Sequence, residues 1–197
     1  MKKIHDVAVV ILSAGLSTRM HSSKAFLPFD AHSTFIGKII ELYFLWGCGK
    51  IVAVVNKEMD DIIRKSDSIP QVVSIVVNEH IDYGRFYSVK LGLTALNGSE
   101  FCFIQNVDNP FIDNNILNAL YENRSPEAFV LPVFQKNGGH PVLLNRKNME
   151  YIRNYPLNNV PLKVVLNAME CKKVEMHNAK ALININSPEE YKRFFNK

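Results

Sequence analysis

The sequence between residues 7 and 24 reads Val7-Ala8-Val9-Val10-Ile11-Leu12-Ser13-Ala14-Gly15-Leu16-Ser17-Thr18-Arg19-Met20-His21-Ser22-Ser23-Lys24. Its first six residues are apolar, which predicts a strand buried on both faces. The rest combines small residues, hydroxyl side chains and two cations in one loop. Such a loop after a strand gathers backbone N–H groups and positive charge, as polyphosphate binding requires. It matches neither the Walker A motif nor the dinucleotide fingerprint, and an ordinary polar surface loop remains the alternative.

The rest of the chain alternates apolar runs with segments of helical spacing. We expect strands at 7–12, 50–55, 71–77, 101–107 and 128–133, with helices at 34–46, 58–65, 85–96 and 114–122 between them. Further strands are predicted at 141–144, 174–176 and 181–185, and further helices at 146–153, 162–169 and from 188 onward. This alternation favours an α/β fold, a three-layer sandwich around a mostly parallel sheet. Residues 1–197 contain no linker or repeat, so we expect a single domain.

Composition narrows the class of protein further. The net charge of +4 is small and scattered, so we expect no nucleic-acid partner. No apolar run is long enough for a signal peptide or a transmembrane helix, so we expect no membrane association. Three cysteines far apart fit a reducing compartment, and the protein is therefore read as cytoplasmic.

Polar side chains follow each of the first four predicted strands. They are residues 13–24, Asn56, Asn78 and Asp108. Ligands of open α/β sheets bind at the carboxyl ends of strands, so these residues predict a site. Asp108 follows a buried run and could bind Mg²⁺, which prefers one or two carboxylates together with phosphate oxygens. Each of these residues, taken alone, could equally be a turn former, and an Asx turn is the alternative for Asp108.

Five stretches, taken in order, resemble the nucleotidyltransferases that include the molybdenum cofactor cytidylyl- and guanylyltransferases. They span nearly the whole chain. The matching residues are Leu12, Ala14, Gly15, Ser17, Arg19, Met20 and Lys24; Asn78, Gly84, Ser88, Gly92 and Leu93; Asp108-Asn109-Pro110; Gly139-His140-Pro141-Val142-Leu143; and Asn184-Ile185-Asn186-Ser187-Pro188-Glu189-Glu190. The resemblance implies a Rossmann-like sheet, similar to that of the nucleotide-diphospho-sugar transferases.

The resemblance also implies a role for each part of the site. Lys24, Arg19 and Asp108 would be catalytic. Asp108 would hold Mg²⁺ with Asn184 or Asn186, and Gly139 and His140 would face the acceptor. The nucleoside triphosphate would be bound by Leu12, Ser13, Ala14, Gly15, Ser17, Asn56, Asn78 and Ser88.

The expected reaction transfers a nucleoside monophosphate to a phosphorylated acceptor such as molybdopterin and releases pyrophosphate. The Ser13-Ala14 pair resembles the cytidylyl type and favours CTP, whereas Asn184 and Asn186 resemble the guanylyl type and leave GTP possible. Two alternatives remain: a sugar- or alcohol-phosphate acceptor, and a nucleotide-binding protein with weak or no turnover. The oligomeric state is not predicted.

Two residues depart from the family pattern. His21 stands where the family usually has glycine, and Arg85 stands where methionine is usual. Arg85 could reach a phosphate or be solvated, and we favour the solvated interpretation. The segment 159–163 lacks the acidic sequence of the cytidylyltransferases, so recognition of the acceptor is not predicted.

Overall fold

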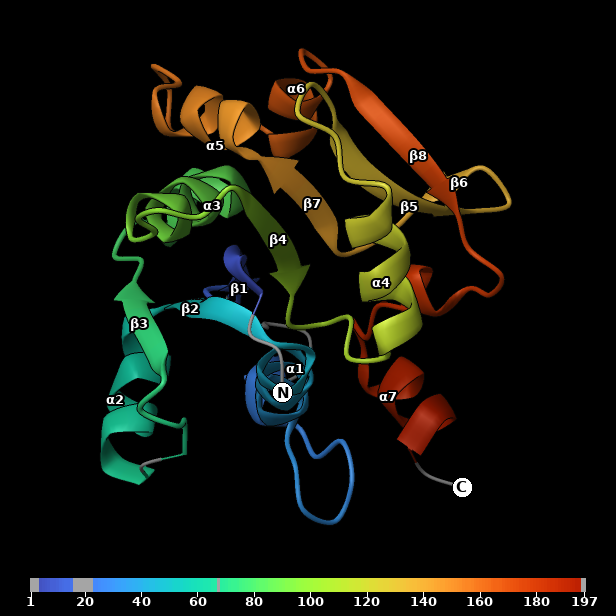
Figure 1. Cartoon of the computed structure of the whole chain (residues 1–197). Helices are drawn as coiled ribbons and strands as arrows, with labels where there is room; N and C mark the ends of the chain where they lie inside the picture. Colours follow the sequence, from blue (N-terminus) through green and yellow to red (C-terminus); the bar gives the residue numbers. More distant parts are fainter. Residues whose placement is uncertain (1–3, 16–22, 67, 196–197) are drawn as a thin grey trace.

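The computed structural model describes residues 4–15, 23–66 and 68–195. In this part of the chain eight strands form one sheet, and helices cover both of its faces (Figure 1). The strands are β1 (Ile4–Leu12), β2 (Cys48–Val55), β3 (Val73–Val77), β4 (Phe101–Asn106), β5 (Phe129–Phe134), β6 (Asn137–Gly138), β7 (Val142–Asn145) and β8 (Cys171–Glu175).

The helices occupy most of the segments that the sequence predicts. The α-helices are α1 (Phe35–Trp46), α2 (Lys57–Ser66), α3 (Gly84–Thr94), α4 (Asn114–Glu122), α5 (Arg146–Arg153), α6 (Leu162–Leu166) and α7 (Pro188–Phe195). In the described residues, three short 3-10 helices are η1 (Lys24–Phe26), η2 (Ile81–Tyr83) and η3 (Lys180–Leu182). Both ends of α1 are capped: the Thr34 side chain accepts a hydrogen bond from the backbone N–H of Gly37, and Gly47 adopts the left-handed conformation after the last turn.

The sheet is mostly parallel, in the order β3-β2-β1-β4-β7-β5-β6. Strands β3, β2, β1 and β4 are parallel neighbours, so their carboxyl ends meet at one edge. Strand β7 is antiparallel to both β4 and β5, and β8 adds to β5 in parallel. The expected α/β sandwich with a mostly parallel sheet is confirmed.

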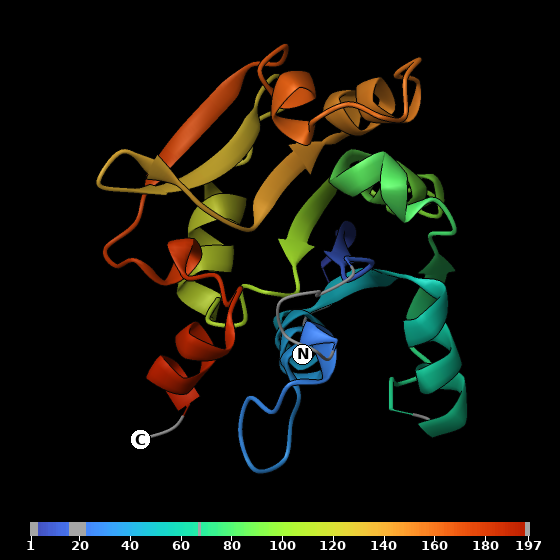
Figure 2. The same cartoon turned by 180° about the vertical axis from the view of Figure 1, so that it is seen from behind.

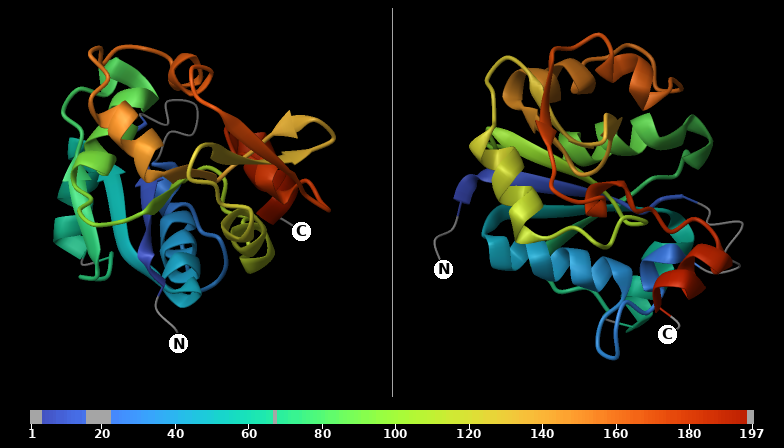
Figure 3. Two further views of the ribbon diagram at one scale, coloured as in Figure 1. Left: turned by 45° about the horizontal axis from the view of Figure 1, so that its top comes forward. Right: turned by 90° about the vertical axis from the view of Figure 1, so that its right-hand side faces the viewer.

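Alternating side chains of β1 feed two separate cores. Val7, Val9 and Ile11 pack with α1, α2 and α4, whereas Ala8, Val10 and Leu12 pack with α3, α5 and α6. We call these the α1 face and the α3 face of the sheet. The right-hand view of Figure 3 shows the resulting three layers, with α3 and α5 on one side of the strands and α1 on the other.

Helix α3 lies directly on the sheet because Gly92 has no side chain. A Cβ at Gly92 would lie 2.9 Å from Val54 Cγ2 and would collide with Val10. Gly92, in the last turn of α3, therefore serves packing.

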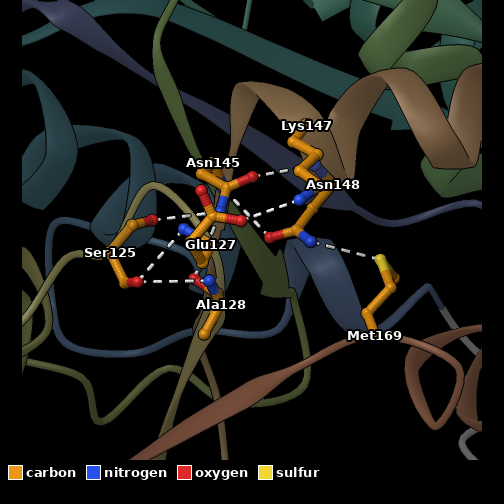
Figure 4. Close-up of polar contacts among 7 residues, drawn as sticks. All are labelled: Ser125, Glu127, Ala128, Asn145, Lys147, Asn148 and Met169. Carbon is orange, nitrogen blue, oxygen red and sulfur yellow. Dashed lines mark hydrogen bonds and ion pairs between the residues drawn. The ribbon is translucent and has the colours of Figure 1, made fainter.

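A buried polar cluster joins β7 and α5 to the loop before β5 (Figure 4). The Asn145 side chain accepts a hydrogen bond from the backbone N–H of Asn148 and donates to the carbonyl oxygens of Ser125 and Ala128. The Asn148 amide contacts Met169 at 3.3 Å, which ties in the segment after α6. Both asparagines are buried, so their hydrogen bonds help to hold β7, α5 and the loop before β5 together.

The predicted strand at 181–185 is wrong. That segment begins in η3 and continues as an irregular chain to α7, because its backbone is bonded to loops instead of to a neighbouring strand. The carbonyl oxygen of Ala181 accepts hydrogen bonds from the backbone of His140 and the side chain of Asn109. Helix α7 lies beside α4 (Figure 2). The ring centroids of Phe194 in α7 and of Phe111, in the loop before α4, are 5.0 Å apart.

Candidate active site

A cavity of about 330 Å³ opens at the carboxyl edge of β1, β3 and β4. Its lining comes from the ends of these strands, from η1, from the start of α3 and from the segment before α7. The described residues around it are Leu12, Ser13, Ala14, Gly15, Ser23, Lys24, Ala25, Asn78, Ile81, Gly84, Arg85, Ser88, Asn106, Val107, Asp108 and Asn186. The parallel topology thus gathers segments that lie up to 174 residues apart in the sequence.

Lys24, Asp108 and Asn186 form the polar centre of this cavity. The Lys24 ammonium donates a 2.7 Å hydrogen bond to Oδ1 of Asn186 and lies 3.7 Å from Oδ2 of Asp108. The side chains of Lys24 and Asp108 are 15% and 16% exposed, so water screens their attraction only in part. A cation and a carboxylate held this way can each contact a phosphate or its counterion.

A buried chain of hydrogen bonds fixes the loop that carries Asp108. Tyr43 of α1 donates to the side-chain oxygen of Gln105 at 3.1 Å. The Gln105 amide donates to the backbone carbonyls of Asn106 and Asn109, at 2.7 and 3.1 Å. These two bonds connect the carbonyl oxygens before and after Asp108 to one buried side chain and so fix the turn that contains Asp108. Gln105 is fully buried, so its amide needs these partners and cannot turn toward solvent.

The same loop holds the segment that carries Asn186. The Asn109 amide donates to the carbonyl of Ile183 at 2.5 Å and to those of Lys180 and Ala181 at longer range. The backbone N–H of Ile185 donates to the carbonyl of Asp108 at 2.7 Å. Asp108 and Asn186 therefore occupy fixed positions relative to each other.

A capping box at the start of α7 orients Asn186 itself. The Glu190 carboxylate accepts from the backbone N–H groups of Asn186 and Ser187, and the Ser187 hydroxyl accepts from the backbone of Glu190. The helix predicted from residue 188 onward is confirmed, since α7 begins at Pro188.

The opposite wall of the cavity contains Asn78 and Ser88. The Asn78 amide donates to the Ser88 hydroxyl at 2.9 Å, while its oxygen accepts from the backbone of His80. Because the Ser88 oxygen accepts this bond, its own hydrogen can donate to a group in the cavity. Asn78 lines the cavity but also fixes the loop before α3.

Four predicted site residues do not line this cavity. Asn56 caps α2 by accepting from the backbone of Met59, and its amide lies 3.4 Å from the carbonyl oxygen of Ala14. Asn184 donates to the carbonyl of Leu182. The other two are Gly139 and His140, which lie against η3. Two further predicted residues, Ser17 and Arg19, and the unusual His21, fall outside the described residues.

Gly139 has a packing reason that the sequence did not reveal. Its backbone N–H donates to Pro132, and a Cβ at this position would collide with the carbonyl oxygen of Ala181. The glycine therefore allows two loops to touch. His140 follows it, with its Nδ1 atom buried and without a hydrogen-bond partner among the described residues. Burial, with the positive charge of Arg85 as the second cause, lowers the pKa of His140 to about 4.

Several cavity residues were not predicted as site residues, above all Arg85 and Asn106. Arg85 is exposed, as the sequence favoured, yet it lines the cavity at the start of α3. Asn106 is buried at the end of β4, and its Oδ1 has no hydrogen-bond partner among the described residues. The sequence does hint that Asn106 belongs to the site, because it is a polar residue near the end of an otherwise apolar predicted strand.

The donor set around Asp108 suits a magnesium ion. Asp108 Oδ1 is buried and has no hydrogen-bond partner among the described residues, and Asn186 offers a second oxygen close to the same point. Nowhere in the described residues do three His, Cys, Asp or Glu side chains group to enclose a metal. A single carboxylate fits Mg²⁺, which keeps several waters and takes its other ligands from the substrate's phosphates.

A cation, a carboxylate and an amide oxygen thus meet in one cavity at the carboxyl edge of the parallel strands. Residues 9–174 match the MobA-like NTP transferase domain, and the chain belongs to that family. The resemblance inferred from the motifs is thus confirmed. A comparison with curated proteins finds no match.

Solved structures of similar fold include bacterial and archaeal proteins. The Rv0371c homologue from Mycobacterium sp. strain JC1 has a TM-score of 0.80 at 16% identity, over 96% of this chain and 94% of that chain. The manganese complex of Rv0371c from Mycobacterium tuberculosis H37Rv has a TM-score of 0.77 at 15% identity, over 98% and 99%. Molybdopterin-guanine dinucleotide biosynthesis protein A from Archaeoglobus fulgidus has a TM-score of 0.72 at 16% identity, over 96% and 97%. At these identities the likeness concerns the fold.

No helix in the described part of the chain is both long and apolar enough to cross a membrane.

Proposed function

We propose that this protein transfers a nucleoside monophosphate, CMP from CTP, to a phosphorylated acceptor such as molybdopterin, with release of pyrophosphate and with Mg²⁺ as cofactor. The observation that carries the proposal is the meeting of Lys24, Asp108 and Asn186 in one cavity, with an unpartnered Asp108 oxygen among the described residues.

The chain's own residues would act by binding and orienting. Lys24 would leave its contact with Asn186 to hold the triphosphate, and Arg19 would assist it from the loop after β1. Asp108 and Asn186 would hold Mg²⁺, which, when bound, neutralises negative charge on the phosphate oxygens. An anionic acceptor needs no general base, so positioning and charge are enough for in-line attack on the α-phosphorus.

The nucleoside would lie along the wall formed by Leu12, Ser13, Ala14, Gly15, Asn78 and Ser88, with Ser17 as a further predicted contact. The hydroxyl group of Ser88 accepts a hydrogen bond from Asn78 and would donate its own hydrogen to the nucleotide. The Ser13-Ala14 pair supports CTP over GTP. The molybdopterin-guanine dinucleotide protein among the similar folds supports a molybdopterin-like acceptor. The manganese complex supports a divalent ion.

The proposal is tested by pyrophosphate release. The purified protein is incubated with Mg²⁺, with each of CTP, GTP, ATP and UTP, and with molybdopterin or a panel of sugar and alcohol phosphates. Release that requires metal, CTP and molybdopterin supports the proposal. Release only with sugar or alcohol phosphates identifies a different acceptor class. That second outcome has some support in the fold, since 4-diphosphocytidyl-2C-methyl-D-erythritol synthase from Anaerococcus prevotii is also similar in structure, with a TM-score of 0.70.

Nucleotide binding without turnover on any acceptor would contradict the proposed activity and indicate a binding protein.

A matched control is Lys38→Ala, which removes a cation that is paired with Glu41 on α1 and that lies outside the cavity. The same assay on this variant should give wild-type rates.

A further inference from the structure

The side chain of Asn106 lies on the α3 face of the sheet, at the end of β4. Side chains of a strand alternate between the two faces, and Cys102 and Ile104 of the same strand pack in the core of the α3 face. Leu12, which pairs with Asn106 in the ladder between β1 and β4, packs there too, whereas the intervening Gln105 bonds to α1 on the other face. Asn106 lines the cavity, so it belongs to the same wall as the proposed nucleoside contacts.

The side-chain oxygen of Asn106 is an acceptor without a donor. Asn106 is only 5% exposed, and its Oδ1 has no hydrogen-bond partner among the described residues. A buried carbonyl oxygen left unpaired costs free energy, so this one is suited to a ligand that supplies an O–H or N–H group. The oxygens of an ionised triphosphate carry no hydrogen and cannot serve.

The backbone of Asn106 is fixed by its own hydrogen bonds. Its carbonyl oxygen accepts from the Gln105 amide at 2.7 Å and from the backbone N–H of Asn109 at 3.3 Å. Among the described residues that line the cavity, only Asn106 and Asp108 have a buried side-chain atom without a partner. The Asp108 atom is accounted for by the proposed Mg²⁺, so the Asn106 oxygen is the acceptor that the proposed function leaves unexplained.

Strand order places Asn106 between the proposed contacts of the phosphates and those of the base. Asn106 precedes Asp108 by two residues, so their Cα atoms are at most about 7 Å apart. Ser88 lies above β1 and β2 instead, because Gly92, one turn later in α3, rests on those two strands. Strand β1 separates β2 from β4. The polar groups along the cavity therefore follow the order Asp108, Asn106, Ser88.

A nucleoside triphosphate has its ribose between the phosphates and the base, and that ribose carries two hydroxyl groups that can donate. We propose that Oδ1 of Asn106 accepts a hydrogen bond from a ribose hydroxyl group of the bound nucleotide and so makes the site specific for ribonucleotides over deoxyribonucleotides. This inference rests on the proposed function for the placement of phosphates and base. A site built to pair a hydroxyl group rejects the analogue that lacks it, because the buried group of the protein is then left unpaired.

The test compares the binding of CTP, 2′-deoxy-CTP and 3′-deoxy-CTP, measured by calorimetry with Mg²⁺ and without acceptor. The wild-type protein should bind CTP at least about tenfold more tightly than one of the two deoxy analogues. Asn106→Leu has a side chain of similar size without the acceptor, so it should bind CTP and that analogue within about twofold of each other. Asn106→Asp keeps an acceptor oxygen and should keep the preference for CTP.

Ser88→Ala is the matched control on the same wall. It removes a proposed contact of the base, so it should weaken CTP and the deoxy analogues alike and change their ratio by less than about twofold. Asn106→Ala removes the same oxygen as Asn106→Leu without adding a branched side chain, and it should lose the preference as well. Backbone amide spectra of each variant verify that the fold is intact.

Equal binding of CTP and both deoxy analogues by the wild-type protein would overturn the inference, and so would a preference that survives in Asn106→Leu and Asn106→Ala. A preference lost in Ser88→Ala alone would assign the ribose contact to Ser88. If Asn106→Leu instead lost a preference for CTP over UTP and kept the ribose preference, the oxygen would belong to the amino group of the base.

Failure of the proposed function looks different. An Asn106-dependent ribose preference without pyrophosphate release on any acceptor would contradict the transfer reaction and leave the ribose contact standing. If GTP binds in place of CTP, the same comparison is made with GTP and its deoxy analogues, and only the proposed base is wrong. A protein that binds no nucleotide would overturn both proposals.

Discussion

The most specific single-residue predictions concern the effect of Lys24 and Asp108 on turnover. Replacing either by alanine should lower turnover at least about a hundredfold, since losing one group that stabilises transition-state charge costs about 2–4 kcal/mol. The measurement is the steady-state rate of pyrophosphate release at saturating nucleotide. Near-normal turnover in either folded variant would remove that residue from the catalytic site.

His140 makes a second prediction, about acid sensitivity. Its pKa in the folded protein is lowered to about 4, while the unfolded chain has the ordinary value near 6.5. Between these values the unfolded chain binds a proton that the folded protein does not, so this residue's contribution to stability is present above pH 6.5 and is lost as the pH falls toward 4.

We therefore expect His140→Gln to lose less stability on acidification than the wild type. The difference in slope should be at most about 1.4 kcal/mol per pH unit. Urea unfolding at pH 7, 5.5 and 4.5 measures it. Parallel pH profiles for the two proteins would show that His140 is accessible to protons in the folded state.

At the scale of elements, the junction of β7 and α5 decides how the second half of the sheet joins the first. Asn145 is buried there and satisfies one backbone donor and two carbonyl acceptors. Asn145→Ala leaves those groups without their partner, which should reduce the free energy of unfolding by about 1–3 kcal/mol.

The control is Asn154→Ala, at the exposed far end of the same helix, which should change stability by less than about 0.5 kcal/mol. Chemical denaturation of both variants gives the comparison. Equal stabilities would mean that water replaces the Asn145 hydrogen bonds at no cost.

The elements themselves were largely predictable from sequence. The predicted limits of α1 and α4 lie within one residue of the observed ones, because helical spacing of apolar residues is a local property of the sequence. The strand expected at 181–185 fails because its backbone hydrogen bonds are made with distant loops: the side chain of Asn109 and the backbone of His140 both donate to the carbonyl oxygen of Ala181.

At the scale of the whole molecule, Asn109 connects the middle of the chain to its end. It is fully buried, and its amide donates to the backbone of residues 180–183. Asn109→Ala should destabilise the protein by about 1–3 kcal/mol and should also lower turnover, because Asp108 and Asn186 lose their common support. Unfolding curves and pyrophosphate release are measured on the same samples.

Asn115→Ala, at an exposed position on α4, is the control and should alter neither quantity. Loss of stability in Asn109→Ala with full activity at low temperature would show that the two halves of the site do not depend on this bridge.

The sequence by itself determined how strands and helices follow one another along most of the chain. It also determined that the sheet is mostly parallel and which loop residues lie at its carboxyl edge. It also pointed to Lys24 and Asp108, since each follows a recognisable strand or motif. The succession of elements and these two residues can be predicted because residues close together in the sequence determine backbone preference and the pattern of burial. Only the tertiary structure decided that Asn186, and not Asn184, lies beside Lys24, and that Arg85 and Asn106 share the cavity. Those facts depend on strand order, register and hydrogen bonds between residues far apart in the chain, which no local pattern encodes.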